Sequence, residues 1–210
     1  PRPDSFMSFT RWINVNGLSV YLLAIACLLW GPWSDLALQF FALDRAGLEQ
    51  GQFWRLWSGP LVHLSWAHVI FNMLGLVVLQ QMFGEELGLR NWLIAFTILA
   101  PVIGVVWLMS PVIAWLPSNS YAFVVGFSAL LHGLFAYAAC LALHRDRWLA
   151  TAVLLVIGLK IIWEQIAGPS AFTSDLIDMP IAADTHLYGY AGGLVLGALM
   201  LRFRPQSAYA

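Results

Sequence analysis

Long apolar stretches, separated by few charged residues, dominate this chain of 210 residues. A helix needs about 20 mostly apolar residues to cross the hydrocarbon core of a bilayer, and fewer if side chains at its ends reach the surface. Six stretches meet this condition, and they cover approximately Leu18–Trp33, Ala67–Phe83, Trp92–Met109, Tyr121–Leu143, Trp148–Ile166 and Leu187–Phe203. The pattern predicts an all-α, polytopic membrane protein with a bundle of six transmembrane helices.

Composition excludes several other classes of protein. Charged residues make up 10% of the chain, against roughly a quarter in a typical soluble domain. The net charge of −1 offers no basic surface, so nucleic acid is not expected as a partner. Cys27 and Cys140 lie in separate apolar stretches, which is typical of buried free thiols. No repeat or long polar linker divides the chain, so residues 1–210 are expected to form one domain surrounded by membrane lipid.

The distribution of arginines predicts the orientation, because basic residues are enriched on the cytoplasmic side of a membrane. With residues 1–17 as a cytoplasmic N-terminal segment, seven arginines are cytoplasmic and two are on the outer side. The seven are Arg2, Arg11, Arg90, Arg145, Arg147, Arg202 and Arg204, and the two are Arg45 and Arg55. Both termini are therefore expected in the cytoplasm. Met7 is a candidate native start, which would make Pro1–Phe6 an addition.

Polar side chains inside a membrane are costly unless each has a partner or a task. On the predicted topology, several of them fall towards the outer half of the membrane, and they come from four helices and an adjoining loop. They are His63, His68, Asn72, Ser128, His132, Lys160, Glu164 and His186. Their gathering on one side of the membrane predicts a functional site near the outer face.

Two stripes of small residues predict how the fourth and sixth helices pack, because small residues let helix backbones approach closely in membranes. The first stripe consists of Ala129, Gly133, Ala136 and Cys140, and the second of Gly189, Gly193 and Gly197. Ser128 and His132 lie four residues apart on a face beside the first stripe, and His186 lies on the face of the second. We therefore expect Ser128 and His186 within hydrogen-bond reach, which is the minimum for nucleophilic catalysis of acyl transfer.

Each of these residues also has a simpler interpretation. A serine in a transmembrane helix usually bonds to a carbonyl one turn earlier. Asp184, just before the sixth apolar stretch, is expected to be a helix N-cap rather than a third catalytic group. Lys160 and Glu164 are spaced for an ion pair within one helix. These interpretations explain the residues one at a time, but they do not explain why the residues gather.

Four motifs resemble those of the rhomboid intramembrane serine proteases. They are Gln52-Phe53-Trp54-Arg55, His68-Val69-Ile70-Phe71-Asn72, Gly126-Phe127-Ser128, and His186 with Gly189 and Gly193. They occur in the order found in that family, on the matching helices, and span roughly residues 50 to 200. Two residues depart from the family pattern: Ala129 follows the serine where glycine is usual, and His132 stands where a tyrosine is common.

The resemblance implies peptide-bond hydrolysis inside the membrane by a dyad of Ser128 and His186. No carboxylate is required if packing against the glycine face fixes the imidazole. The developing oxyanion would be held by the Ser128 backbone N–H and by His68 and Asn72, which are four residues apart on one helix. Support of the dyad is assigned to His132, Gly126 and Gly189. No metal and no cofactor are expected.

Local sequences also resemble the rhombosortase subgroup of that family. They cover Gly126–Gly133, Leu159–Gln165 and His186–Gly189. This resemblance implies a bacterial inner-membrane enzyme with its active site towards the outer face. Its partner would be a membrane-anchored protein with a C-terminal tail that contains a Gly-Gly signal, a transmembrane helix and basic residues. Simple hydrolysis of that tail and transfer of the product to a lipid-derived amine both stay open.

Lateral access for the substrate is expected past the fifth helix, with the loop of residues 167–185 as a lid and Pro180 as its hinge. Lys160 and Glu164 are assigned to a substrate gate, with a simple ion pair as the alternative.

Two other classes of function stay open. The convergence of His68, His132 and His186 suits a haem- or metal-binding membrane subunit, and a rhomboid-like protein without activity could bind client proteins.

Overall fold

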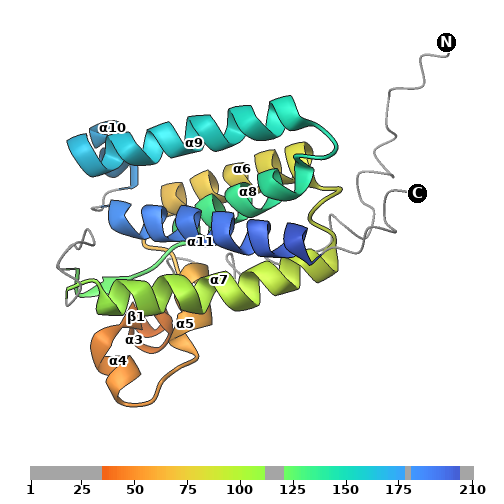
Figure 1. The fold of residues 1–210 in the computed structure, drawn as a ribbon. Coiled ribbons are helices and arrows are strands. Elements are labelled where there is room, and N and C mark those ends of the chain that lie inside the picture. The colour runs from red at the N-terminus through yellow and green to blue at the C-terminus, as the bar shows by residue number, and fades with distance from the viewer. Residues whose placement is uncertain (1–34, 112–120, 178–180, 204–210) are drawn as a thin grey trace, which may run out of the picture.

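The structure, a computed structural model, describes residues 35–111, 121–177 and 181–203. Its long helices are α6 (Trp66–Phe83), α7 (Leu89–Met109), α8 (Ser128–Ala142), α9 (Arg147–Ala167) and α11 (Ala183–Arg202). They run side by side, with α6, α8 and α11 in one direction and α7 and α9 in the other (Figure 1). The fold is therefore mostly helical, as the apolar stretches predict.

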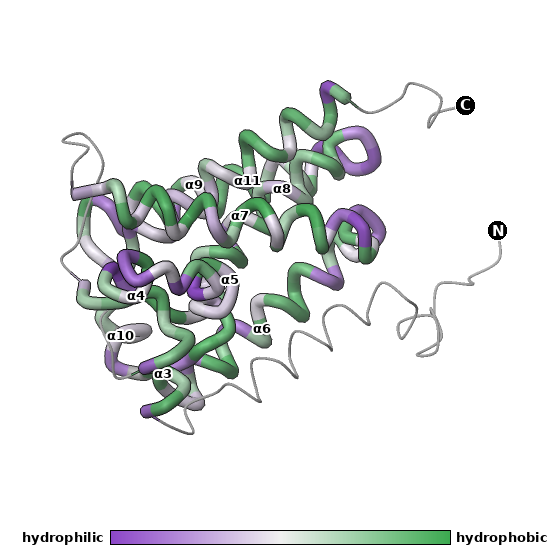
Figure 2. Tube along the Cα trace, turned by 90° about the horizontal axis from the view of Figure 1, so that it is seen from below, coloured by the Kyte–Doolittle hydropathy of each residue, from purple (hydrophilic) through white to green (hydrophobic). Residues whose placement is uncertain are grey.

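Among the described residues, three helices, α6, α7 and α9, are long and apolar enough to cross a membrane. They agree with the predicted spans Ala67–Phe83, Trp92–Met109 and Trp148–Ile166 to within a few residues. Figure 2 shows hydrophobic residues along the helices and hydrophilic residues in turns at the end of the bundle from which the C-terminus leaves. The outer face of α9 is apolar and exposed, as a lipid-facing surface must be, through Leu155, Val156, Leu159, Ile162 and Ile166.

The other predicted spans differ in their outcome. The first, Leu18–Trp33, lies outside the described residues. The last, Leu187–Phe203, corresponds to α11. Asp184 does not cap this helix as predicted, because α11 already begins at Ala183 with Ala182 as its N-cap. Asp184 lies instead in the first turn, where the helix dipole favours a negative charge.

The fourth predicted span, Tyr121–Leu143, is shorter as a helix than its apolar stretch. Gly126 adopts φ 95°, which ends any continuous helix, and α8 begins only at Ser128. The preceding strand β2 (Phe123–Val124) pairs antiparallel with β1 (Leu43–Asp44). The 15 residues of α8 span roughly 22 Å, less than the ~30 Å of a hydrocarbon core. As a helix alone, α8 is therefore too short to cross the core, and the extended segment before it has its backbone paired in β1–β2.

Short elements follow one another before the first long helix. They are α3 (Asp35–Phe41), α4 (Arg45–Glu49), α5 (Arg55–Ser58) and η1 (Gly59–Leu61), and they lie with β1 beside α7 (Figure 1). Arg55 holds this region together from inside: its guanidinium, 4% exposed as a residue, donates to the Asp44 carboxylate at 2.8 Å and to the Ala42 carbonyl at 2.6 Å. A buried charge with several acceptors fixes the loop that leads into α6.

Helix α8 is buried along most of its length, and its most extensive packing is against α11. A Cβ added to Gly133 would lie 2.8 Å from the Gly189 carbonyl oxygen, and one added to Gly193 would overlap the Gly133 carbonyl. The predicted meeting of the two small-residue stripes is thus confirmed. Because α8 and α11 run in the same direction, their first residues lie at the same end of the bundle.

Candidate active site

Ser128 and His186 face one another across the α8–α11 contact. Ser128 is the first residue of α8, and His186 lies in the first turn of α11. The Ser128 Oγ lies 2.9 Å from His186 Nε2, and His186 is 4% exposed. A hydroxyl at this distance can donate its proton to an imidazole nitrogen, which is the geometry of a serine nucleophile beside its base.

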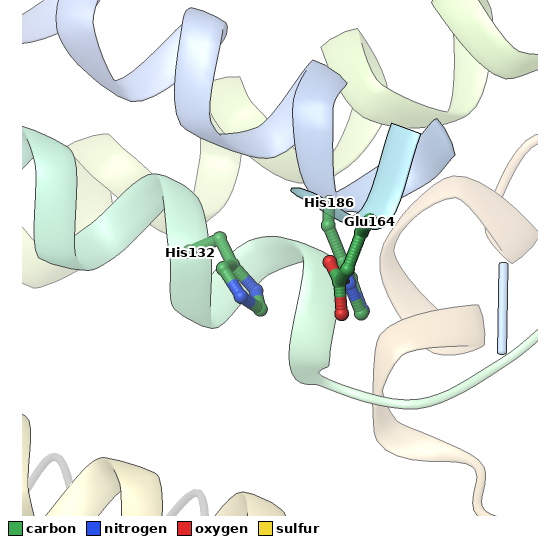
Figure 3. A group of neighbouring side chains, drawn as sticks. All are labelled: His132, Glu164 and His186. Carbon is green, nitrogen blue, oxygen red and sulfur yellow. Dashed lines mark hydrogen bonds and ion pairs between the residues drawn. The ribbon is translucent and has the colours of Figure 1, made fainter. Parts of the chain in front are cut away.

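The other ring nitrogen of His186 contacts Glu164, which comes from α9. His186 Nδ1 lies 2.9 Å from Glu164 Oε2, and both side chains are buried. Figure 3 shows the Glu164 carboxylate lying against His186, while His132 stands beside them. Since an ionised carboxylate only accepts hydrogen bonds, Nδ1 carries the proton and Nε2 is free to accept from Ser128.

His132 and Lys160 complete this cluster. The rings of His132 and His186 are stacked, with centroids 4.3 Å apart. His132 Nδ1 donates to the Ser128 carbonyl oxygen at 2.7 Å, and its Nε2 accepts from Lys160 Nζ at 2.9 Å. Lys160 Nζ also lies 2.8 Å from Glu164 Oε1, so the predicted ion pair within the helix is confirmed. A role of Lys160 as a substrate gate stays a prediction.

Asn72 and His63 form a second pair of polar side chains. The Asn72 amide lies 2.9 Å from His63 Nε2, and His63 Nδ1 lies 3.0 Å from the Leu61 carbonyl oxygen. The carbonyl accepts from Nδ1–H, so the Asn72 amide donates to Nε2 of a neutral imidazole. One amide hydrogen of Asn72 is committed to His63, and the second is left for another acceptor. His63 thus holds the amide in place.

The environment of His63 leads to a pH prediction. Burial lowers the pKa of His63 from 6.5 to about 4, although its bond to Leu61 acts in the opposite direction. As the pH falls from 6.5 towards 4, the unfolded chain takes up a proton that the folded protein does not bind. The free energy of unfolding should therefore decrease over this range, on the order of 3 kcal/mol in total from this group.

A His63→Gln variant provides the comparison, because it lacks this titration. Denaturant unfolding in detergent at several pH values between 7 and 4 should show a smaller loss of stability for the variant than for the natural sequence. Equal losses would mean that His63 does not resist protonation in the folded protein.

The His68 ring lies next to Gly126, two residues before Ser128 in the chain. A Cβ on Gly126 would overlap the His68 ring, so glycine is needed both for this contact and for its positive φ. Among the described residues, no group bonds to His68 Nδ1, although the atom is buried. The His68 ring packs edge-on against His63, with centroids 4.8 Å apart.

A cavity of about 570 Å³ brings these groups together. Its polar lining consists mainly of His68, Asn72, Ser128, His132, Lys160, Glu164, Thr185 and His186, and the rest of the wall is largely apolar. The structure therefore gathers the candidate residues of α6, α8, α9 and α11 around one space. His63 lies behind this wall, bonded to Asn72.

The loop predicted as a lid contains helix α10 (Ala171–Ile177), and Thr173 and Ile177 of this helix line the cavity. Movement of this segment stays a prediction. Pro180, its predicted hinge, lies outside the described residues.

Donor atoms of His132, Glu164 and His186 lie within 4.8 Å of one another and could hold a metal ion. A haem between His132 and His186 does not suit the geometry, because their rings stack face to face at 4.3 Å and leave no space for a macrocycle. The lone pair of His132 Nε2 and one oxygen of Glu164 already bind the Lys160 ammonium.

The contact of Glu164 with His186 is the feature that sequence reasoning missed. The spacing of Lys160 and Glu164 accounts for one carboxylate oxygen only. A carboxylate inside a membrane is costly unless its oxygens have partners. The second carboxylate oxygen of Glu164, which the pair with Lys160 leaves unassigned, is therefore the signal that could have predicted a further partner.

The sequence profile of the Rhomboid domain family matches residues 50–203, which include all the candidate site residues. A search of curated proteins finds no match. Members of this family are generally intramembrane serine proteases. Since the match covers well over half of the chain and the helices that bear the site, the chain belongs to the rhomboid family.

Proposed function

We propose that this protein is an intramembrane serine endopeptidase in which Ser128 is the nucleophile and His186 the general base. The observation that carries the proposal is the 2.9 Å contact between Ser128 Oγ and His186 Nε2 in a cavity of a membrane-spanning bundle. The proton of Ser128 passes to Nε2 as Oγ bonds to the scissile carbonyl carbon. The same proton then passes to the leaving amine as the C–N bond breaks. Water resolves the acyl-enzyme in simple hydrolysis.

Donors for the oxyanion are available at the start of α8 and on α6. The N–H of Ser128 has no acceptor within its helix, because it belongs to the first turn. Asn72 and His68 line the same cavity, and Asn72 has one uncommitted amide hydrogen. Donors fixed before the reaction stabilise the developing charge more effectively than solvent, which must reorganise.

Replacing Asn72 with alanine should lower kcat about 100- to 1,000-fold, the usual result of losing one oxyanion donor. Asn91→Ala is a matched control, because Asn91 donates one hydrogen bond, to the Glu86 carbonyl, away from the cavity. Cleavage of a membrane-anchored reporter by both variants, with their thermal stability, is the measurement. Equal rates for the two variants at equal stability would exclude Asn72 from the oxyanion site.

The proposed substrates are C-terminal tails with a Gly-Gly signal on exported, membrane-anchored bacterial proteins. The resemblance to rhombosortases supports this specificity, and so does the largely apolar wall of the cavity, which suits an apolar substrate segment. Glycine pairs weaken a substrate helix and make its carbonyl groups accessible. Whether the cut end passes to water or to a lipid-derived amine depends on which nucleophile reaches the acyl-enzyme.

The proposed location is the bacterial inner membrane, with both termini in the cytoplasm and the active site towards the outer face. Arg90 lies in the first turn of α7, Arg145 lies between α8 and α9, Arg147 begins α9, and Arg202 ends α11. The directions of the helices bring these arginines to the end of the bundle opposite Ser128 (Figure 1). Basic residues favour the cytoplasmic side, which supports this orientation.

The test is co-expression with two reporters that differ only in their C-terminal region: one has a Gly-Gly tail, and the other has the two glycines replaced by leucines. Loss of the tail from the first reporter only, together with labelling of Ser128 by a fluorophosphonate, is the expected result. Absence of both labelling and cleavage would refute the protease. Labelling without cleavage of the Gly-Gly tail would refute only the substrate assignment.

A further inference from the structure

Glu164 carries a negative charge into the interior of the bundle, where a charge is costly unless it is paired. Its side chain is 7% exposed, and both carboxylate oxygens are engaged. One contacts Lys160 Nζ at 2.8 Å, and the other contacts His186 Nδ1 at 2.9 Å. The second contact joins α9 to α11 at the base itself.

We propose that Glu164 is a positioning residue that completes a Ser128–His186–Glu164 triad. The proposal rests on the protease function proposed above. It assigns to the carboxylate two tasks that a Ser–His dyad leaves to packing alone. Glu164 holds the proton on His186 Nδ1, so that the lone pair of Nε2 faces the Ser128 hydroxyl. It also compensates the positive charge that forms on His186 when the Ser128 proton arrives.

The proton balance of the step is simple. The Ser128 proton moves to His186 Nε2 while Oγ bonds to the scissile carbon and the carbonyl electrons move to oxygen. The proton on Nδ1 stays in place and keeps its hydrogen bond to Glu164, which remains ionised throughout. The Nε2 proton then leaves with the amine, and the imidazole returns to its neutral state.

Lys160 and His132 explain how the carboxylate is held in this position. Lys160 is four residues before Glu164 on α9, and its ammonium bridges Glu164 Oε1 and His132 Nε2. His132 in turn stacks on His186 and donates to the Ser128 carbonyl oxygen. The carboxylate is therefore fixed from α9 and α8, and its remaining oxygen is directed at His186. This arrangement is the type of supporting hydrogen-bond network that sets the orientation of a catalytic imidazole.

Glu164→Gln is the direct test, because it keeps the shape of the side chain and removes its charge. In the full-length protein purified in detergent, kcat for the reporter and the rate of fluorophosphonate labelling should fall about 10³- to 10⁴-fold, with little change in KM. Glu85→Gln is the matched control, since the Glu85 side chain is 73% exposed and, in the described part of the chain, pairs only with Arg145. A Glu164→Gln rate within about tenfold of the natural protein would overturn the proposal.

A double variant separates positioning from simple charge neutralisation. If Glu164 serves only to neutralise Lys160, then Lys160→Met combined with Glu164→Gln removes both charges and should recover the activity. If Glu164 positions His186, the double variant should remain as slow as Glu164→Gln. Recovery to within about tenfold of the natural protein would contradict the triad.

A spectroscopic measurement tests the hydrogen bond between His186 and Glu164 independently of enzyme activity. In an inactive Ser128→Ala background, proton NMR of protein labelled with ¹⁵N-histidine should show a strongly deshielded Nδ1 proton of His186. This signal should disappear on Glu164→Gln, and it should persist on Glu85→Gln. Persistence in both variants would overturn the proposal.

Three outcomes distinguish the triad from competing explanations. If the natural protein neither labels at Ser128 nor cleaves any reporter, the proposed protease function fails. If it is active and Glu164→Gln is equally active, only the triad fails. Activity lost on chelation and restored by zinc would identify His132, Glu164 and His186 as metal ligands, and this result would also overturn the triad.

Discussion

Ser128→Ala should lower the rate of proteolysis about 10⁶-fold, the largest catalytic effect expected in this protein. In serine proteases, removal of the nucleophile leaves only binding and oxyanion stabilisation, and losses of this size follow. Ser128 Oγ is the atom that lies 2.9 Å from His186 Nε2, and no neighbouring hydroxyl of the described cavity wall shares this contact. The measurement is reporter cleavage together with covalent labelling by a fluorophosphonate.

The loss of activity in Ser128→Ala should not add to the loss in His186→Ala. His186→Ala and the double variant should be about as slow as Ser128→Ala, because the two residues act as one unit. Ser58→Ala serves as a control, since Ser58 is also buried and donates to a backbone carbonyl, that of Phe41. Equal labelling of the natural protein and Ser128→Ala would show that the reactive nucleophile is another residue.

Gly193→Ala should produce a large loss of stability, although it adds only a single methyl group. A Cβ at Gly193 would overlap the Gly133 carbonyl, a backbone group that cannot rotate away. Helices α8 and α11 would have to separate, at a cost on the order of 4 kcal/mol. Because Ser128 and His186 begin these two helices, their separation should also slow labelling by fluorophosphonate.

Gly192→Ala is a matched control one position away. A Cβ at Gly192 would meet Leu99 Cδ2 at 3.3 Å, the end of a flexible side chain that can move. Thermal unfolding in detergent should show a small change for Gly192→Ala and a large one for Gly193→Ala. Similar transition temperatures for the two variants would mean that the close contact of α8 with α11 does not limit stability.

Much of the candidate site follows from helical periodicity. Spacings of four residues place Ser128 with His132, His68 with Asn72, and Lys160 with Glu164, and the structure shows the last pair bonded. Glycine and alanine stripes predict the seam between α8 and α11, because only small residues permit a backbone contact. These features lie within one helix or depend on residue size, so the local sequence determines them.

Other features depend on how the helices sit against one another. Strand β2, which lies just before α8, pairs with β1 from about 80 residues earlier in the chain. The bond between Asn72 and His63 needs the first loop to fold back onto α6. The apolar pattern of the sequence does not predict these contacts. It indicates which face of a helix is polar, but not how deep the helix lies in the bundle or which helix packs beside it.

The sequence by itself determined that this chain forms apolar helices and that a serine and a histidine lie on two faces able to meet. Only the tertiary structure decided that Glu164 of α9 reaches His186 of α11, across 22 positions of sequence. The physical reason is that a carboxylate inside the membrane takes the nearest available partners. Its partner within the helix is fixed by spacing, whereas its partner on another helix is fixed by the rotation and depth of two packed helices.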